Sequence, residues 1–151
     1  MFFARRFDTA GAAAMDAWDG YRASRSRIQQ GWRDRAVRNP LVLTGDVHRA
    51  WANNLMADYA NPNSAVIGTE LVCTSIASGG DGSTTSTIPD VATNPHLKFY
   101  SNLRGYTLTT ISPSQVRADF RAVPLVSEHG AAVSTLKSFA IVDGVPGLEA
   151  L

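Results

Sequence analysis

The chain has 151 residues, of which 44% are apolar and 18% are charged, which is enough for one domain with a hydrophobic core. The formal net charge of +1 excludes a protein that binds nucleic acid or an anionic membrane through its overall charge. We expect no membrane span, because no apolar run approaches roughly 20 residues, and no export signal, because no apolar segment with a cleavage site follows Arg5-Arg6.

The first expected element is an amphipathic helix over residues 21–37. Tyr21, Ile28 and Trp32 recur at helical spacing and form one apolar stripe, and arginines occupy the remaining surface. Asn39-Pro40 ends the helix, because the residue before a proline disfavours the helical conformation.

Basic residues are concentrated in this region. Eight of the fourteen lie before Pro40, and we interpret them as a solvated helix face, with a rim that attracts phosphate as the alternative. These eight are Arg5, Arg6, Arg22, Arg25, Arg27, Arg33, Arg35 and Arg38. Asp19 is expected to be the N-cap of the helix, with Trp18 packed beside it.

The rest of the chain is predicted to be mostly β-strands. Residues 41–44 form the short, wholly apolar type of strand that is buried on both faces of a sheet. Residues 51–59 alternate between two faces, and residues 70–76 are predicted to be another buried strand. The Ser/Thr-rich stretch from Ser78 to about Pro95 is too long for a plain connection and is expected to be functional or disordered.

The last third of the chain has the clearest pattern. Residues 106–111 and 116–123 are predicted to be strands joined by the turn Ser112-Pro113-Ser114-Gln115. In the second of these strands apolar residues alternate with charged ones, which predicts a sheet with one solvated face. Residues 134–142 are predicted to be a final strand.

These elements predict an α/β fold with one main helix followed by five or six strands, either as an α+β fold or as the closing half of an α/β sandwich. Strand 41–44 should be covered on both faces, but the chain offers one substantial helix. We therefore expect polypeptide outside this chain to cover the other face.

The sharpest candidate site is the tetrapeptide Gly45-Asp46-Val47-His48, directly after strand 41–44. An aspartate and a histidine at the end of a buried strand present an oxygen ligand and an imidazole ligand together, as metallohydrolases do. Gly45 is expected to let the backbone turn sharply, so that both side chains converge on one metal ion. The alternative is structural, with Asp46 capping a turn and His48 an ordinary surface histidine.

Other candidates carry weaker signals. The amide oxygens of Asn53 and Asn54 suit a hard cation such as calcium, although most asparagines only satisfy loop backbone. His96, Lys98 and Arg104 lie before a predicted strand, where cations are able to neutralise a phosphate.

Two further segments carry residues of functional type. Backbone N–H groups of residues 78–82 are able to cradle an anion, but the segment lacks the Gly-Lys-Ser/Thr ending of a nucleotide-binding loop. Cys73 lies mid-strand among apolar neighbours, so an inert buried thiol is expected there.

Several stretches match, in order, those of one known family. They are residues 15–21 (Met-Asp-Ala-Trp-Asp-Gly-Tyr), 39–48 (ending in Gly-Asp-Val-His), 68–71, 74–76, 78–82, 94–96, 104–106 and 142–148. With these stretches the chain resembles the C-terminal part of the PhoD-like alkaline phosphatases and phosphodiesterases. The Gly-Asp-Val-His run is the most specific element, and the Trp-Asp-Gly-Tyr run supports it.

The resemblance implies the α/β sandwich of the metallophosphoesterases and metal-dependent hydrolysis of phosphate mono- and diesters. It makes Asp46 and His48 metal ligands in a site that uses calcium and iron. Other calcineurin-like phosphoesterases carry histidine where this chain has Asp46, and the harder oxygen ligand suits calcium. We also place His96 and Arg104 as catalytic residues around the metal site, with Lys98 near them. The intact enzymes are exported, so a secreted or cell-envelope location is implied.

The resemblance also has a gap. Family members begin with an N-terminal domain and the first half of the sandwich, which supply early aspartates, a cysteine ligand of iron and an asparagine. None of those motifs lies upstream of Met15, so we expect residues 1–151 to be the C-terminal portion of a PhoD-like metallophosphatase domain, with little or no activity alone.

The expected partners are a phosphate ester substrate and the absent N-terminal half of the enzyme, and no specific nucleic acid. Two alternatives stay open. One is a non-catalytic subunit that completes a split phosphatase, and the other is a stand-alone β-rich binding module in which Asp46 and His48 are structural.

Overall fold

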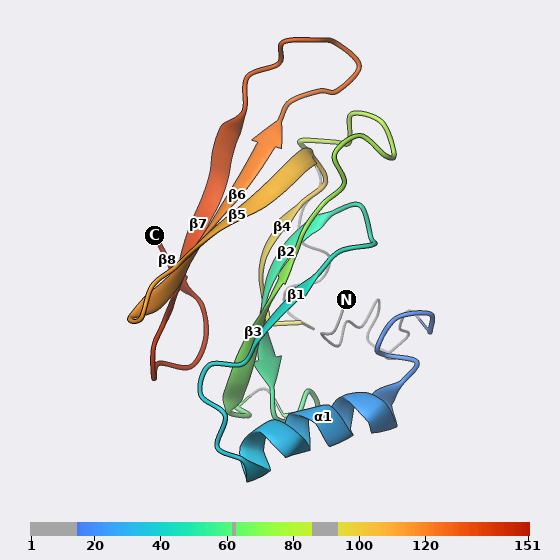
Figure 1. Cartoon of the computed structure of the whole chain (residues 1–151). Coiled ribbons are helices and arrows are strands. Elements are labelled where there is room, and N and C mark those ends of the chain that lie inside the picture. The colour runs from blue at the N-terminus through green and yellow to red at the C-terminus, as the bar shows by residue number, and fades with distance from the viewer. Residues whose placement is uncertain (1–14, 62, 86–93) are drawn as a thin grey trace.

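The computed structural model describes residues 15–61, 63–85 and 94–151. In this part of the chain one helix, α1 (Arg22–Asp34), precedes two four-stranded sheets. The strands are β1 (Leu41–Thr44), β2 (Ala50–Met56), β3 (Val66–Val72), β4 (Leu97–Ser101), β5 (Arg104–Ile111), β6 (Gln115–Val123), β7 (Ser134–Val142) and β8 (Glu149–Ala150). The two sheets stack, and α1 lies on the outer side of the first (Figure 1). The predicted α/β class, with one main helix and mostly strands, is confirmed.

The first sheet has the strand order β1-β3-β2-β4. β1 pairs in parallel with β3, and β2 is antiparallel to both of its neighbours. β1 is therefore an edge strand, and Leu43 is 62% exposed. The prediction that strand 41–44 is buried on both faces is wrong at Leu43, whereas Leu41 and Val42 pack against the two core clusters on opposite faces. Whether polypeptide outside this chain covers the exposed part stays a prediction.

Element boundaries in this sheet differ from the expected ones. The strand expected at 70–76 runs from Val66 to Val72 and contains Gly68, which weakened its pattern. β4 was not expected, because its five residues are too short a run to show a clear alternation, and it pairs with β2 along one side. The expected loop up to Pro95 lies partly outside the described residues.

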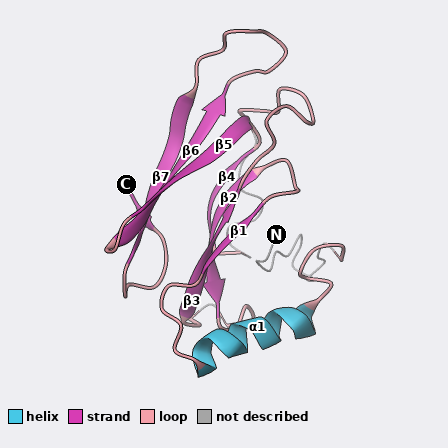
Figure 2. Ribbon diagram, in the orientation of Figure 1, coloured by secondary structure: helices cyan, strands magenta, loops and turns pink. Residues whose placement is uncertain are grey.

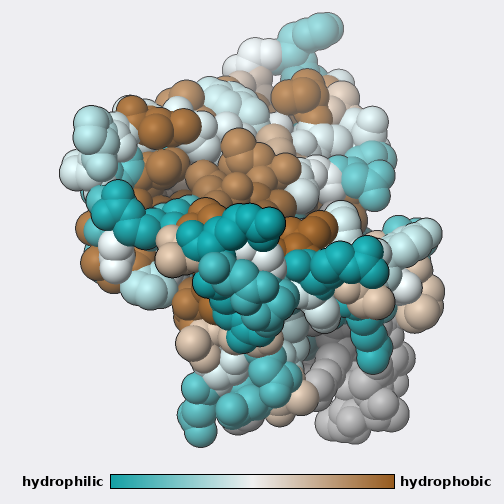
Figure 3. Space-filling view, turned by 60° about the horizontal axis from the view of Figure 1, so that its bottom comes forward, coloured by the Kyte–Doolittle hydropathy of each residue, from teal (hydrophilic) through white to brown (hydrophobic). Residues whose placement is uncertain are grey.

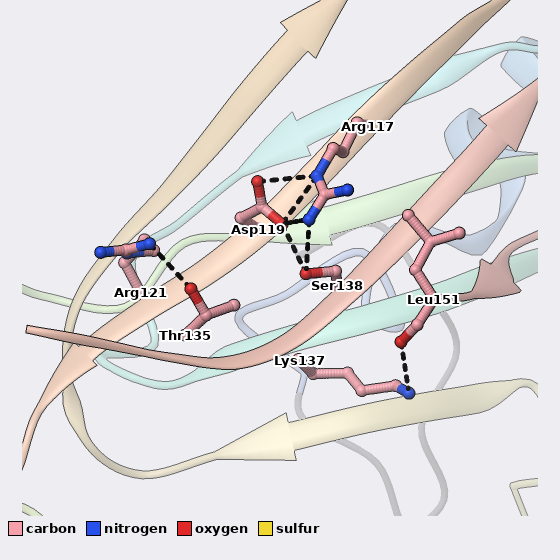
Figure 4. Close-up of polar contacts among 7 residues, drawn as sticks. All are labelled: Arg117, Asp119, Arg121, Thr135, Lys137, Ser138 and Leu151. Atoms are coloured by element: carbon pink, nitrogen blue, oxygen red, sulfur yellow. Dashed lines mark hydrogen bonds and ion pairs between the residues drawn. The ribbon is translucent and has the colours of Figure 1, made fainter.

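The second sheet is an antiparallel array in the order β5-β6-β7-β8. The expected strands 106–111, 116–123 and 134–142 are confirmed, and the two-residue strand β8 is additional. Charged residues of β6 gather on the outer face, where Arg117 and Ser138 both donate hydrogen bonds to the Asp119 carboxylate (Figure 4). The predicted solvated face is confirmed.

The main core lies between the two sheets. It joins Ala50, Ala52 and Leu71 of the first sheet to Ala118, Phe120, Phe139 and Ile141 of the second. The rings of Phe99 and Phe120 pack across this interface with their centroids 4.8 Å apart. Burial of one such ring contributes about 1.5–3 kcal/mol, so this layer holds the sheets together.

The face of α1 that packs on the sheet is polar. Arg25 and Gln29 are buried, whereas Tyr21 is 61% exposed and Ile28 is 38% exposed. The expected apolar stripe is thus wrong except for Trp32, which packs on a second core cluster around Trp51. Figure 3, which turns the α1 end toward the viewer, shows that the outer surface here has hydrophilic side chains next to a hydrophobic patch.

Buried partners explain this polar interface. Arg25 donates a hydrogen bond to the Asp19 carboxylate at 2.7 Å and lies over the Tyr59 ring. Gln29 donates one to the backbone carbonyl oxygen of Met56. Asp19 therefore pairs with Arg25 and is not the N-cap, a position that Tyr21 occupies without a side-chain bond.

The remaining arginines of this region agree with the expected solvated face. Arg22, Arg27, Arg33, Arg35 and Arg38 are exposed, whereas Arg5 and Arg6 lie outside the described residues. No helix in the described part of the chain has the length and apolar character needed to cross a membrane.

Candidate metal site

The backbone directly after β1 is left-handed at two residues that are not glycine. The φ angle is 76° at Asp46 and 53° at His48. For most side chains this conformation costs about 1–2 kcal/mol per residue, and Asn, Asp and His tolerate it best. Gly45 has no positive φ, and a Cβ there would make an ordinary contact 3.7 Å from the Cys73 carbonyl oxygen. The expectation that Gly45 makes the turn is wrong, because Asp46 and His48 make it themselves.

Both candidate ligands are open to solvent. The side chains of Asp46 and His48 are exposed, and neither has a hydrogen-bond or ion-pair partner among the described residues. A carboxylate that caps a turn accepts a backbone N–H, so the structural alternative lacks the bond that it requires here. Within the described part of the chain, the two groups are free to bind a ligand.

Arg104 holds the backbone of this turn through hydrogen bonds from its buried side chain. Its side chain is 2% exposed, and Nη1 donates hydrogen bonds to the carbonyl oxygen of His48 and to Ser75 Oγ. Nη2 donates to the carbonyl oxygen and Oδ1 of Asn102, at 2.8 and 2.9 Å. Both Nη atoms are thus engaged with protein acceptors, so Arg104 holds the backbone of this turn, and its expected contact with phosphate stays a prediction.

The glycine-rich loop after β3 lies against His48 and Arg104. A Cβ at Gly79 would lie 3.9 Å from both His48 Nδ1 and Arg104 Nη1. Gly82 has a φ of +82°, and a Cβ there would lie 1.8 Å from the Asn102 carbonyl oxygen, so no other residue fits. Whether the N–H groups of this loop bind an anion stays a prediction.

Asp81 ties this loop to the one that follows β6. Its carboxylate accepts hydrogen bonds from the backbone N–H of Val126 at 2.6 Å, and from the N–H and hydroxyl of Ser127 at 2.8 Å each. The bond from Val126, followed by those from Ser127, holds the pKa of Asp81 below its ordinary value. The loops after β1, β3 and β6 gather at one end of the molecule (Figure 2).

The structure does not bring His96 to this end. His96 is 7% exposed and packs edge-on against the Tyr59 ring, with the centroids 5.1 Å apart. It precedes β4, whose opposite end, Ser101, pairs with Ala50 near His48. The length of β4 therefore separates His96 from the Asp46–His48 turn. Its expected catalytic position is not the observed one.

Lys98 and the two asparagines also lie elsewhere. The Lys98 ammonium donates a hydrogen bond to the carbonyl oxygen of Pro95. Asn53 is fully buried and donates to Glu70, and Asn54 accepts a hydrogen bond from the backbone N–H of Leu148. Asn54 Oδ1 is thus occupied by a backbone N–H, and whether either amide ligates calcium stays a prediction.

Buried Glu70 was missed. It is 0% exposed and also accepts a hydrogen bond from Thr44 Oγ1 at 2.7 Å, so it joins β1 to β3. The burial of the Tyr59 hydroxyl raises the pKa of that group to about 12. A charged residue inside a predicted buried strand was the available signal for this polar layer.

A cavity beside Asp46 was missed as well. It measures about 460 Å³ and lies between the start of α1 and the turn after β1, and its walls include Trp18, Tyr21, Ser24 and Val47. Its volume falls in the range of small-molecule sites. The Trp-Asp-Gly-Tyr motif was the sequence signal that pointed to it.

Comparison with known proteins decides the family. Residues 2–120 match the family model described as PhoD-like phosphatase. The chain belongs to the PhoD-like phosphatase family. It is 42% identical over 154 residues to alkaline phosphatase D of Bacillus subtilis (strain 168), an alignment that covers 99% of this chain and 26% of that protein.

The PhoD-like fold is confirmed by a solved structure of PhoD. That structure superposes with a TM-score of 0.92 at 39% sequence identity, and it covers 100% of this chain and 30% of the PhoD chain. The resemblance inferred from the sequence is therefore confirmed. This PhoD-like chain spans about a quarter of the length of its Bacillus relative.

Proposed function

We propose that this chain supplies Asp46 and His48 as metal ligands to a phosphoric ester hydrolase that cleaves phosphate mono- and diesters. The carrying observation is that both side chains are exposed and without partners among the described residues, on strained backbone that Arg104 holds. Strain of this kind collects at functional sites. The name of the Bacillus relative, alkaline phosphatase D, supports the reaction class.

The two donors suit the proposed metals in different ways. A carboxylate oxygen from Asp46 fits calcium, and an imidazole nitrogen from His48 fits iron. A bound metal ion would lower the pKa of a water molecule and neutralise charge on the phosphoryl oxygens. Among residues 15–61, 63–85 and 94–151, no three His, Cys, Asp or Glu side chains converge on one point. We therefore place the remaining ligands in polypeptide outside these residues.

This chain's own residues have separate tasks in the proposal. Asp46 and His48 bind, and Arg104 and the glycine-rich loop fix their backbone, which limits the loss of conformational entropy on binding. Residues 1–151 form the C-terminal portion of a PhoD-like metallophosphatase domain, and an N-terminal half completes it. The fraction of the relative that is covered supports this arrangement. The completed enzyme acts in the secreted or cell-envelope space.

Metal binding by the chain itself tests the ligand assignment. Calorimetric titration of the purified chain with calcium or ferrous iron should show weak binding that Asp46→Asn and His48→Gln each reduce. Glu149→Gln and His129→Gln are matched controls, because both residues are exposed and lie on other loops or strands. Equal binding by all four variants would refute the assignment.

Hydrolysis tests the division of the site. With a chromogenic phosphate ester, calcium and iron, the chain alone should show little or no turnover. Co-expression with the part of the Bacillus relative that the chain does not cover should restore turnover, and Asp46→Asn should abolish it. Robust turnover by the chain alone, sensitive to Asp46→Asn, would contradict the division and keep the ligand assignment.

One observation supports the alternative of a stand-alone β-rich binding module. The described residues lack a three-ligand cluster, as expected for a β-rich module in which the Asp46–His48 turn has no metal. That alternative predicts a cooperative thermal transition that calcium and iron leave unchanged, and no complementation.

A further inference from the structure

The cavity beside Asp46 has aromatic walls. Trp18 and Tyr21, on the segment before α1, form its sides, and Val47 from the turn after β1 adds apolar surface. Tyr21 is 61% exposed, although a tyrosine ring usually buries most of its area when it has only a packing role. Trp18 also packs against the core cluster around Trp51, so one edge of the cavity is rigid.

The charges that line this cavity exclude a phosphate group from its interior. The residues that line it include the acidic Asp16 and Asp46 and the neutral polar Ser24, and no described lysine, arginine or histidine contributes. Two carboxylates in the wall disfavour the negative oxygens of a phosphate. A neutral planar group meets no such penalty and gains contacts with both rings.

We propose that the cavity, hereafter the Trp18–Tyr21 pocket, binds the organic group of a phosphate ester and favours an aromatic one. Asp46 lies at the border: it lines the pocket and also belongs to the candidate metal site, whereas His48 does not line the pocket. The phosphate then lies on the His48 side of Asp46 and its organic substituent on the Trp18 side. This inference rests on the proposed function for the position of the phosphate, and it adds the residues that select the ester.

Indole N–H signals in a proton–nitrogen correlation spectrum give a direct test, because the chain has three tryptophans. The full chain is titrated with phenol, phenyl phosphate, methyl phosphate and inorganic phosphate, and Trp18→Phe assigns the Trp18 signal. Phenol and phenyl phosphate should shift the Trp18 signal more than those of Trp32 and Trp51. Methyl phosphate and inorganic phosphate should not shift it.

Variants separate the pocket from general aromatic binding. Tyr21→Ala should weaken phenol binding about five-fold, the size expected for one ring contact, and Tyr21→Phe should restore it. Tyr106→Ala is the control, since Tyr106 is an exposed tyrosine on β5 outside the Trp18–Tyr21 pocket, and should leave the response of the Trp18 signal unchanged. Backbone signals of each variant report whether the fold is retained.

Three results would overturn the pocket. They are an equal response to methyl phosphate, unchanged phenol affinity in Tyr21→Ala, and the absence of any shift at Trp18. Failure of the proposed function is distinguishable. If the chain binds phenol but the completed enzyme hydrolyses no ester, the proposed phosphatase is refuted and the pocket is supported. If the completed enzyme hydrolyses phenyl and methyl phosphate equally well and the chain does not bind phenol, the pocket alone is refuted.

Discussion

The buried guanidinium of Arg104 donates a hydrogen bond to the backbone carbonyl oxygen of His48, 56 residues earlier in the chain. The same side chain bonds Ser75 and Asn102, so one residue joins the turn after β1, the loop after β3 and the turn before β5. His48 adopts a left-handed φ of 53°, and this bond offsets part of the cost. The candidate metal ligand is thus held through its backbone while its imidazole stays exposed.

Replacing Arg104 should unfold this corner. Arg104→Met leaves several buried acceptors without a donor, and we expect the free energy of unfolding to fall by about 3 kcal/mol. Urea denaturation measures the change. Arg38→Met is the control, because Arg38 is exposed and its ion pair with Asp143 spans 3.4 Å, so a loss below about 1 kcal/mol is expected. Equal losses in the two variants would contradict the positioning role.

Backbone strain at Asp46 can be measured apart from its carboxylate. Asp46→Gly and Asp46→Ala both remove the proposed ligand, but only glycine accepts a φ of 76° freely. We expect the glycine variant to be more stable than the alanine variant by about 1 kcal/mol, and both to lose metal binding. A thermal melt of each provides the comparison, and alanine equal to glycine would show that the turn relaxes.

Two glycines of the loop after β3 form a matched pair. A Cβ at Gly82 would lie 1.8 Å from the Asn102 carbonyl oxygen, whereas a Cβ at Gly80 has no neighbour within 4 Å, and both residues have positive φ. Gly80→Ala should lose about 1 kcal/mol from strain alone. Gly82→Ala should lose clearly more and disturb the Arg104 bonds. Similar losses would mean that the loop moves away without cost.

Acid should loosen the link between the loops after β3 and β6. The pKa of Asp81 lies below its ordinary value of 3.8, because backbone and hydroxyl donors bind the ionised form. Its stabilisation is therefore complete above that ordinary value and is lost as the pH falls through the lower folded-state pKa. Asp81→Asn should be less stable than the parent at neutral pH and approach it in acid. A constant difference down to low pH would contradict this link.

Alkali should act on Tyr59. Burial raises its pKa from 10.0 to about 12, so the unfolded chain loses this proton first. The corresponding stability is complete below pH 10 and is lost between pH 10 and 12, by about 2 kcal/mol. Denaturation midpoints across this range should fall less for Tyr59→Phe than for the parent. Parallel decline of the two proteins would assign the effect to other groups.

The regular features of this fold could be predicted from the sequence. Alternation in β6 identified the solvated face of the second sheet, and its neighbours in the hairpin followed from turn chemistry. The run Gly45 to His48 marked the corner where Asp46 and His48 lie, because a strand end followed by two donors is a local pattern. Spacing along the chain involves only residues that are close in the sequence, so these predictions did not depend on tertiary contacts.

Tertiary contacts decided the rest. Helical periodicity favoured Tyr21 and Ile28 as the packed face of α1, but Asp19, Tyr59 and the carbonyl oxygen of Met56 supply polar partners beneath the helix, so Arg25 and Gln29 turn inward. The sequence predicted Arg104 to be a cation available to phosphate, but in the structure acceptors from segments far apart in the sequence bind its guanidinium group. Which polar group is buried, and against what, depends on partners that arrive from other parts of the chain, and no local pattern contains that information.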